Sequence, residues 1–562
     1  MDFRKAVAAA LAAKTDIPAE DIADMLETPP NPALGDLAFP CFRLAKAMRK
    51  APPQIAAELA EALPLPAGVS KVQAAGPYVN FSLDRGAFAK EALGRVFAEG
   101  MAYGGCDAGK GRTVCVEFSS INIAKPFSIA HLPTTAIGHS LNRIYRACGY
   151  QTVAINYLGD WGTQFGKMIV AYLKWGDKPV RESSVRELVK LYVRFHEEAK
   201  TDERLNDEAR AWFRKIEAGD AEAVGLWQQF KALTLEEVSQ TYALLGVQFD
   251  SFAGESFYED KMQAVIDELD DKGLLVSDQG AKIVDLSAYD MPPCIIVKSD
   301  GATLYATRDL AAAIYRKQQY DFAKSLYVVA YQQTLHFRQF FKVLELMGKD
   351  WVKDCAHVSF GMVSMEEGTL STRQGNVVYL EDALEAAVAK TREIIEEKSP
   401  DLEDKDAAAK AVGVGAVIWS VLYNSRIKDM AFSWSKMLSF EGETGPYAQY
   451  THARACSVLR KAAPDLDKVD YALLEDDVSA ALVSAIGAFP AAVYSAMDKN
   501  EPYLVSRQVI AVCQAFNRFY YEQRIMADEP AQNNTRLALT EAARQTIRNG
   551  LYLLGIEAPE RM

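Results

Sequence analysis

The sequence has few of the features that would indicate a metalloprotein, a secreted protein or a membrane protein. Its eight cysteines are scattered, with no Cys-x-x-Cys pair and no histidines at a matching spacing, so neither a zinc site nor a disulfide framework is predicted. No apolar run looks long enough to cross a membrane. An alanine-rich segment near the start resembles a signal peptide only faintly, because Lys14 and Asp16 follow it closely. These absences predict a cytoplasmic protein with reduced cysteines.

Positive charge is also scarce. The chain has 62 Lys and Arg against 75 Asp and Glu, a net charge of -13, which argues against non-specific nucleic-acid binding through the overall field. A local basic face is compatible with this balance, because phosphate contacts need only a few cations in one place. The 562 residues, 49% hydrophobic and 24% charged, predict three or four soluble globular domains.

The hydrophobic pattern predicts a strand, a helix and a second strand near residue 130. Val114–Phe118 is short, apolar and β-branched, and Ile129–Cys148 has apolar residues at helical spacing. Gly149 ends this helix, and Gln151–Tyr157 is a second apolar run. Such a unit implies parallel strands joined by a right-handed crossover, and so an α/β fold.

The loop between the first strand and the helix carries the side chains that chemistry needs. In doubly wound sheets, ligands bind beyond the carboxyl ends of the strands, near exposed amides at helix N-termini. A loop rich in serine and asparagine is equally typical of a polar turn with a helix cap. Its polar residues are Glu117, Ser119, Ser120, Asn122, Lys125, Ser128 and His131.

Two segments of this unit, which begin at Ser119 and Tyr157, carry recognisable motifs. They read Ser-Ser-Ile-Asn-Ile-Ala-Lys-Pro-Phe-Ser-Ile-Ala-His-Leu and Tyr-Leu-Gly-Asp-Trp-Gly-Thr-Gln-Phe-Gly. Together they resemble the nucleotide-binding part of class I arginyl-tRNA synthetases. The family's His-Ile-Gly-His signature keeps its second histidine as His131, but Ser128 replaces the first histidine and Ala130 replaces the glycine. The resemblance implies that these three residues bind ATP.

The resemblance covers nearly the whole chain and implies an α/β multidomain protein. It implies an N-terminal α+β domain at residues 1–105, which reads the tRNA D-loop and ends in a strand over Val72–Leu83. A Rossmann-like catalytic domain with a doubly wound parallel sheet follows at 106–404, with a mostly helical insertion at about 167–290. An all-helical anticodon-binding domain completes the chain at 405–562.

An arginine substrate has a planar guanidinium with five N–H donors, so its pocket needs carboxylates and a shielding ring. The resemblance implies that Glu255 and Asp309 hold the guanidinium and that Tyr305 caps it. Tyr305 and Asp309 lie four residues apart, which places them on one side of a helix. An alternative for Asp309 is an acid in the first helical turn, stabilised by the helix dipole. The implied arginine-binding residues are Glu117, Asn122, Glu255, Tyr305, Asp309 and Gln333.

Within this set, Asn122 and Gln333 are expected to share the α-amino and carboxylate groups of arginine. Gln333 follows an apolar strand that begins at Lys324, and His336 comes three residues later. A structural role, a contact with adenosine and a plain helix cap all remain open for His336.

The segment from Gly361 to Val378 resembles the second class I signature, Lys-Met-Ser-Lys-Ser, in a Ser-Thr-Arg form. It implies ATP contacts from Ser371, Thr372 and Arg373, with Arg373 and Gln374 where a lysine is usual. Lys125 can replace that lysine, and the alternative is a solvated loop cation. The implied catalytic residues, which neutralise or position the phosphates, are Lys125, Ser128, His131 and Arg373.

Aromatic and basic residues at both ends of the chain are candidates for RNA contact. By resemblance, Tyr78 and Asn80 follow a Gly-Pro turn in the segment that reads the D-loop, where a ring can stack on a base and an amide can pair with its edge. Such aromatics are more often core residues, and Tyr78 could simply fill the domain core. The candidates in the C-terminal helices are Tyr447, Tyr450, Arg454, Tyr520 and Arg524.

The implied reaction is the activation of arginine by ATP, followed by transfer to tRNA(Arg). Mg2+ is expected to arrive with ATP, held by phosphates and water without a dedicated metal site. A cytoplasmic monomer that needs bound tRNA to activate arginine is expected. Two alternatives remain: an RNA-binding relative that has lost catalysis, and a class I ligase for another amino acid.

Overall fold

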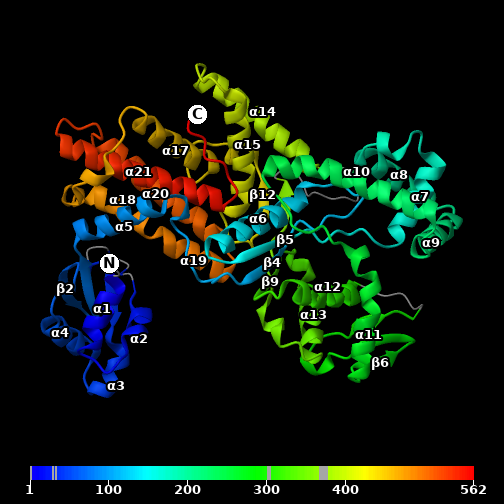
Figure 1. The fold of residues 1–562 in the computed structure, drawn as a ribbon, viewed down its shortest axis with the longest axis horizontal. Coiled ribbons are helices and arrows are strands. Elements are labelled where there is room, and N and C mark those ends of the chain that lie inside the picture. The colour runs from blue at the N-terminus through cyan, green and yellow to red at the C-terminus, as the bar shows by residue number, and fades with distance from the viewer. Residues whose placement is uncertain (1–2, 28, 30, 32–33, 300–304, 366–377) are drawn as a thin grey trace. The chain divides into compact units, whose positions relative to one another are not determined.

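The computed structural model describes residues 3–27, 29, 31, 34–299, 305–365 and 378–562. The chain forms two compact units, whose elements are labelled in Figure 1. The first comprises residues 1–103, 455–488 and 511–546, and the second comprises residues 104–454, 489–510 and 547–562.

The N-terminal segment of the first unit packs helices against a three-stranded antiparallel sheet of order β1-β3-β2. The strand predicted over Val72–Leu83 is wrong in extent, because the chain makes two strands there. Gly76, with φ +57°, and Pro77 separate them, and glycine adopts such a φ at no steric cost. The elements are α1 (Phe3–Ala12), α2 (Ala19–Met25), β1 (Leu37–Pro40), α3 (Leu44–Met48), α4 (Pro52–Ala62), β2 (Val69–Ala75) and β3 (Tyr78–Leu83).

The remainder of the first unit is helical. Arg85 on α5 (Arg85–Glu99) pairs with Asp477 on α18 (Asp477–Gly487) at 2.9 Å, and the Tyr103 hydroxyl donates to the Ile486 carbonyl at 2.8 Å. The unit boundaries fall inside three helices, α17 (Gly445–Leu459), α20 (Tyr503–Glu522) and α21 (Pro530–Leu553).

The second unit is built on a four-stranded parallel sheet of order β10-β9-β4-β5. The predicted strand, helix, strand unit is confirmed as β4, α6 and β5, with a 3-10 turn over Ile129–His131 before α6. Figure 1 shows α6 on one side of the sheet and α12 and α13 on the other. The elements are β4 (Thr113–Glu117), α6 (Leu132–Ala147), β5 (Gln151–Ile155), α12 (Tyr305–Tyr320), β9 (Lys324–Tyr327), α13 (Thr334–Leu346) and β10 (Cys355–His357).

The segment expected to be a mostly helical insertion also contains strands. β7 pairs with β6 on one side and with β8 on the other, in an antiparallel sheet. The sequence pattern did not predict this sheet because β6 is largely exposed and so shows little apolar alternation. Gln279 and Gly280, both with positive φ, form the hairpin turn, and this pair is the sequence feature from which the hairpin could have been predicted. The elements are α7 (Thr163–Trp175), α8 (Val185–Glu198), α9 (Arg204–Glu217), α10 (Ala221–Leu245), α11 (Met262–Asp271), β6 (Leu275–Asp278), β7 (Ala281–Val284) and β8 (Cys294–Val297).

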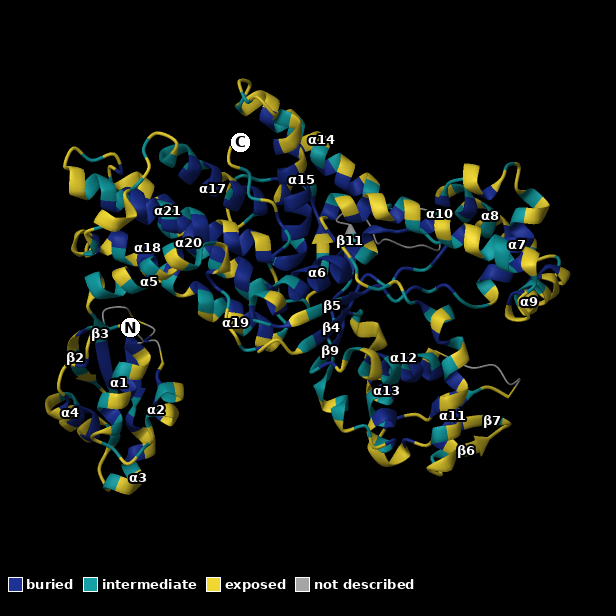
Figure 2. Ribbon diagram, viewed as in Figure 1, coloured by how far each residue is buried: buried dark blue, intermediate teal, exposed yellow. Residues whose placement is uncertain are grey.

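Helices dominate the chain after residue 405, as expected, with one short exception. β12 (Met430–Phe432) pairs in parallel with β11 (Val363–Met365). Figure 2 shows that α15 is largely buried. The helices after residue 405 are α15 (Lys405–Leu422), α16 (Trp434–Met437) and α19 (Phe489–Lys499), in addition to α17, α18, α20 and α21, and α14 (Leu380–Lys398) precedes them.

One segment corrects the expectation that no apolar run has membrane-spanning length. Within Asp477–Lys499, a stretch of 18 residues has a mean hydropathy of 1.6, and 39% of that stretch is buried. Ala488 separates it into α18 and α19, and one such segment is weak evidence for a membrane span.

Candidate active site

A pocket of about 420 Å³ lies where the carboxyl ends of β4, β5 and β9 meet the helices that follow them. Ligands of parallel sheets bind at this edge. Four of its lining residues, from Tyr305 to Arg316, lie at helical spacing along α12. All six residues predicted to bind arginine line this pocket: Glu117, Asn122, Glu255, Tyr305, Asp309 and Gln333.

The first of three acids in the pocket is Glu117, the last residue of β4. Its Oε2 accepts a hydrogen bond from Nη1 of Arg316 at 2.5 Å. Arg316 is 1% exposed, and its guanidinium lies over the rings of Tyr157 and Tyr327, at 5.3 and 5.8 Å from their centroids. Burial raises the pKa of Glu117, and the charge of Arg316 opposes that rise. The floor of the pocket is therefore a buried ion pair between two aromatic rings.

The second acid is Asp309, on α12 one turn after Tyr305. Its Oδ2 lies 2.6 Å from Nε2 of His336, in the first turn of α13. His336 therefore has a specific partner, which its place in the sequence does not indicate. Burial lowers the pKa of His336, but the hydrogen bond and charge of Asp309 and the charge of Glu117 more than offset this, so that the pKa is raised.

The third acid is Glu255, which begins a 3-10 segment over Glu255–Lys261. Arg308 lies 3.7 Å from Glu255 and 2.8 Å from Glu259. Burial raises the pKa of Glu255 to about 7, with the charge of Arg308 opposing the rise and that of Asp309 adding to it. Each acid of the pocket therefore has a cationic or potentially cationic neighbour from the protein.

Asp160 binds the backbone and side chain of Ser256, the residue after Glu255, a role that the sequence analysis did not predict. It is fully buried and accepts hydrogen bonds from Lys231 Nζ at 2.6 Å, from the Ser256 amide at 2.9 Å and from the Ser256 hydroxyl at 2.7 Å. The Glu255 amide donates to the Leu158 carbonyl at 2.9 Å. The available signal was the position of Asp160 as the acid of the Tyr-Leu-Gly-Asp-Trp-Gly motif.

The loop after β4 is held in an unusual backbone conformation. Ser119, Ser120 and Ala124 all have φ between 46° and 67°, a region that non-glycine residues rarely adopt and that is common at functional sites. The Ser119 hydroxyl lies 2.7 Å from that of Tyr242, and the Ala124 amide donates to Thr234 Oγ1 at 3.1 Å. Both partners are on α10, so the helical insertion helps to hold this loop.

Asn122 and Gly159 bring this loop against the loop that follows β5. The Ile123 amide donates to the Gly159 carbonyl at 3.1 Å, and the Gly159 amide donates to the Ile121 carbonyl at 2.8 Å. A Cβ atom on Gly159 would lie 2.4 Å from Oδ1 of Asn122. Glycine at this position therefore leaves space for the amide of Asn122.

Tyr305 lies at the open side of the pocket. It is 68% exposed and also lines a neighbouring cavity of about 580 Å³. Its ring is thus placed between two cavities, where it can cover a ligand.

The residues predicted to bind ATP phosphates gather before α6, as far as the structure describes them. The Ser128 amide donates to Nδ1 of His131 at 3.2 Å, and Ala130 is exposed. Burial lowers the pKa of His131, which favours the neutral ring. Burial also lowers the pKa of Lys125, while the charge of Glu255 opposes this, so Lys125 interacts with the acid-lined pocket. Ser371, Thr372, Arg373 and Gln374 lie outside the described residues.

Among the residues that the structure describes, no cluster of three or more His, Cys, Asp or Glu is arranged to hold a metal ion. The carboxylates of the pocket lie against the basic side chains of Arg308, Arg316 and His336.

Tyr78 and Asn80 lie on β3 with different exposures. Tyr78 is half-buried and packs edge-on against Phe42, which is 54% exposed. Asn80 is 2% exposed, so its amide can reach a base only if its surroundings move.

The C-terminal candidates for RNA contact are distributed over both units. In the second unit, Tyr447 is half-buried on α17, and Tyr450 is 40% exposed with Arg454 over its ring at 4.9 Å. In the first unit, Tyr520 is 38% exposed, and Arg524 pairs with Asp528 at 2.9 Å.

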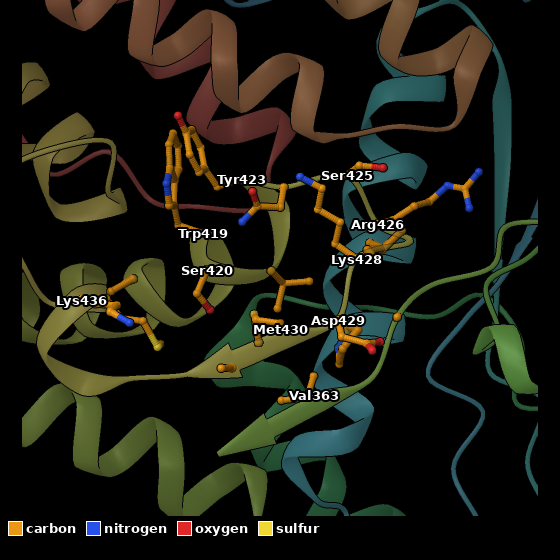
Figure 3. A pocket seen from close by; sticks show the side chains of 18 of the residues that line it. Val363, Trp419, Ser420, Tyr423, Ser425, Arg426, Lys428, Asp429, Met430 and Lys436 are labelled. Carbon is orange, nitrogen blue, oxygen red and sulfur yellow. The ribbon is translucent and has the colours of Figure 1, made fainter. Parts of the chain in front are cut away.

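A separate cavity of about 270 Å³ lies beside β11 and β12, shares no lining residue with the acid-lined pocket and contains none of the predicted site residues. Figure 3 shows the stacked rings of Trp419 and Tyr423 at its edge, with centroids 5.8 Å apart. Trp419 also donates to the Glu443 carbonyl at 2.9 Å.

Three family models match the chain. The model described as "tRNA synthetases class I (R), catalytic domain" matches residues 93–434. The "DALR anticodon binding domain" matches residues 448–562, and the "Arginyl tRNA synthetase N terminal domain" matches residues 1–83.

Known proteins resemble the chain over its whole length. It is 54% identical to an arginine–tRNA ligase of Clostridioides difficile over 100% of both chains, and 51% identical to one of Halothermothrix orenii over 97% of both. The structure of Thermus thermophilus arginyl-tRNA synthetase matches with a TM-score of 0.84 and 26% identity, over 100% of this chain and 99% of that one. The Plasmodium falciparum enzyme shares the fold, with a TM-score of 0.81 and 21% identity over 96% and 94% of the two chains. The chain therefore belongs to the class I arginyl-tRNA synthetases.

Proposed function

We propose that this chain activates arginine with ATP to arginyl-adenylate and transfers the arginyl group to the 3'-terminal adenosine of tRNA(Arg) in translation. The observation that carries this proposal is the acid-lined pocket at the carboxyl edge of the parallel sheet, where Glu117, Glu255 and Asp309 meet. A guanidinium is the side chain best matched to closely spaced carboxylates, because its planar donors can bind two acids at once.

Within this pocket, arginine would lie with its guanidinium between Glu255 and Asp309, covered by Tyr305. Asn122 and Gln333 would hold its α-amino and carboxylate groups, with Glu117 nearby. The positions of the residues support this orientation. Asn122 lies in the same loop as Lys125 and precedes the ATP-binding segment, whereas Tyr305 lines the neighbouring cavity of about 580 Å³.

The ATP end of the site would work by electrostatic stabilisation. The arginine carboxylate would attack the α-phosphate in line, and Lys125 and Arg373 would neutralise the charge that develops on the departing pyrophosphate. Ser128, Ala130 and His131 would hold ATP on one side, and Ser371, Thr372 and Arg373 on the other. Mg2+ would accompany ATP, carried by its phosphates and water.

The remaining parts of the chain would bind tRNA. Residues 1–105 would read the D-loop through Tyr78 and Asn80, residues 106–404 would carry out catalysis, and residues 405–562 would bind the anticodon. The candidate anticodon contacts are Tyr447, Tyr450, Arg454, Tyr520 and Arg524. We further propose that the protein acts as a cytoplasmic monomer.

Arginine-dependent ATP–pyrophosphate exchange tests this function. We expect exchange with arginine when tRNA is present, and none with lysine or glutamine as controls. Protein that binds tRNA but gives no exchange with any amino acid would instead be an RNA-binding relative without catalysis.

The KM for arginine should fall as the pH is raised from 6 to 8. Burial raises the pKa of Glu255 to about 7, so this acid is increasingly protonated at the lower pH and then offers a neutral acid to a cation. Each pH unit below that pKa weakens binding by up to about tenfold. KM values across this range test the prediction, and Glu255→Gln should raise KM and flatten the profile. An unchanged slope in that variant would contradict the assignment.

Gly159→Ala should raise the KM for arginine about tenfold, a free-energy change of about 1.4 kcal/mol. The new Cβ would collide with the Asn122 amide, while two backbone hydrogen bonds prevent Gly159 from moving aside. Exchange kinetics would measure the effect. Gly225→Ala on α10, where a Cβ meets nothing within 4 Å, is the matched control, and equal KM values for the two variants would contradict the prediction.

A further inference from the structure

His336 occupies an unusual place in the acid-lined pocket. It lines the pocket beside Asp309 and Glu117, and its Nε2 lies 2.6 Å from Oδ2 of Asp309. The two side chains are 25% and 21% exposed, so the contact is partly shielded from water. The His336 ring is also held by its neighbours, because it lies parallel to the ring of Phe340 and edge-on to that of Phe337.

We propose that His336 is a positioning residue for arginine, which binds one oxygen of Asp309 and thereby directs the other oxygen to the substrate guanidinium. This inference rests on the proposed function. A carboxylate on a helix can rotate about its side-chain torsions, and a second hydrogen bond that fixes it reduces the entropy lost when the ligand binds. A donor on α13 thus orients an acceptor on α12.

The protonation state of His336 matters to this role. The neutral ring, with its proton on Nε2, donates to Asp309 and leaves the carboxylate charge available to the guanidinium. The protonated ring is itself a cation paired with Asp309, and so it competes with the guanidinium for the same charge.

The charged and titratable groups around the ring favour protonation. Asp309 on α12 and Glu117 on β4 raise the pKa of His336 against the effect of burial. His357 on β10 faces the same cluster. Its pKa is lowered by burial, and the charge of His336 lowers it further. The two acids therefore favour the protonated ring of His336, and arginine binding should displace its proton.

Two substitutions separate positioning from simple packing. His336→Phe keeps a ring against Phe340 but removes the donor, whereas His336→Gln keeps an N–H at a similar reach but cannot be protonated. In arginine-dependent exchange at pH 8, we expect His336→Phe to raise the KM for arginine about tenfold with little change in kcat, and His336→Gln to restore a KM within about twofold of the parent protein.

The pH profile is the decisive readout. Between pH 8 and pH 6, the KM of His336→Gln should rise less steeply than that of the parent protein, with Glu255 supplying the remaining slope. His357→Gln is the matched control: His357 stacks on Phe337 at 4.2 Å and bonds to the Val329 carbonyl, without lining the pocket. It should leave both KM and its slope unchanged.

Three results would overturn the inference. The first is a KM for His336→Phe at pH 8 that lies within twofold of the parent value. The second is a rise in KM for His336→Gln that equals the rise for His336→Phe. The third is a pH dependence of KM in His336→Gln that has the same slope as in the parent protein. A parent protein with no arginine-dependent exchange would instead refute the proposed function itself.

Discussion

Asp309→Asn should lower kcat/KM for arginine by roughly three orders of magnitude. Removing one partner of a buried ion pair costs about 3–5 kcal/mol, because the remaining charge is left without compensation. Asparagine has the same shape and can still contact His336, so the loss would reflect charge and not a cavity. Arginine-dependent exchange measures the change, and arginine use that remained intact would refute the assignment of the guanidinium to this acid.

Asp321→Asn is the matched control for that substitution. Asp321 directly follows α12 and is 90% exposed, and it pairs with Lys317 at 2.7 Å. Exposed ion pairs contribute about 0–1 kcal/mol, so this charge neutralisation at the other end of the helix should leave the KM for arginine unchanged. A large effect there would mean that overall charge, and not the contact at Asp309, determines arginine binding.

Arg316→Met should lower the free energy of unfolding by about 3–5 kcal/mol. It removes the partner of Glu117 from a site where Arg316 is 1% exposed, and the carboxylate cannot reach water without opening the pocket. Urea denaturation followed by tryptophan fluorescence would measure the loss. Lys317→Met, on the same helix but paired with the exposed Asp321, should cost less than about 1 kcal/mol.

The pH dependence of Arg316→Met gives an independent check. Without Arg316, the largest opposing influence is lost, so burial and the charge of Asp309 raise the pKa of Glu117 further above the unfolded value. The folded state tolerates the protonated acid, so the free energy of unfolding of the variant should approach that of the parent protein at low pH. It should fall further below the parent value as the pH rises through that raised pKa. A stability gap that did not widen with pH would contradict an uncompensated charge as the cause.

The double variant Arg316→Met with Glu117→Gln completes the test. With both charges removed, most of the stability should return, because a buried ion pair contributes little more than a neutral pair of similar volume. Arginine binding should be weakened, since the pocket of the double variant lacks one acid. Stability that returned together with unweakened arginine binding would show that Glu117 does not contribute to arginine binding.

The sequence by itself determined the local architecture of this protein. β4 and β5 follow from apolar runs, and α6 follows from apolar residues at helical spacing. Both are short-range patterns, because periods of 2 and 3.6 residues can be recognised among residues that are close in the sequence. The motifs that begin at Ser119 and Tyr157 likewise placed the polar loops at the carboxyl edge of the sheet, where the pocket is found. The β6–β7 hairpin could not be predicted in this way, because β6 is largely exposed and only the last two residues of β7 are buried, which leaves too short an apolar pattern.

Tertiary structure alone decided how the acids of the pocket are compensated. The three pairs join side chains from different elements that are far apart along the chain: Arg316 with Glu117, His336 with Asp309, and Arg308 with Glu255. No local pattern encodes such a pair, since it depends on the way in which a helix lies across a strand or another helix.

The same holds for Asp160, whose burial between Lys231 and Ser256 exists only after the insertion has folded back on the sheet. Burial then sets the pKa values of the pocket, because desolvation acts on the folded chain and not on the residue type. Residue types and their spacing could therefore indicate which acids are candidates to bind a cation, whereas the charge that each acid carries is decided by the folded surroundings.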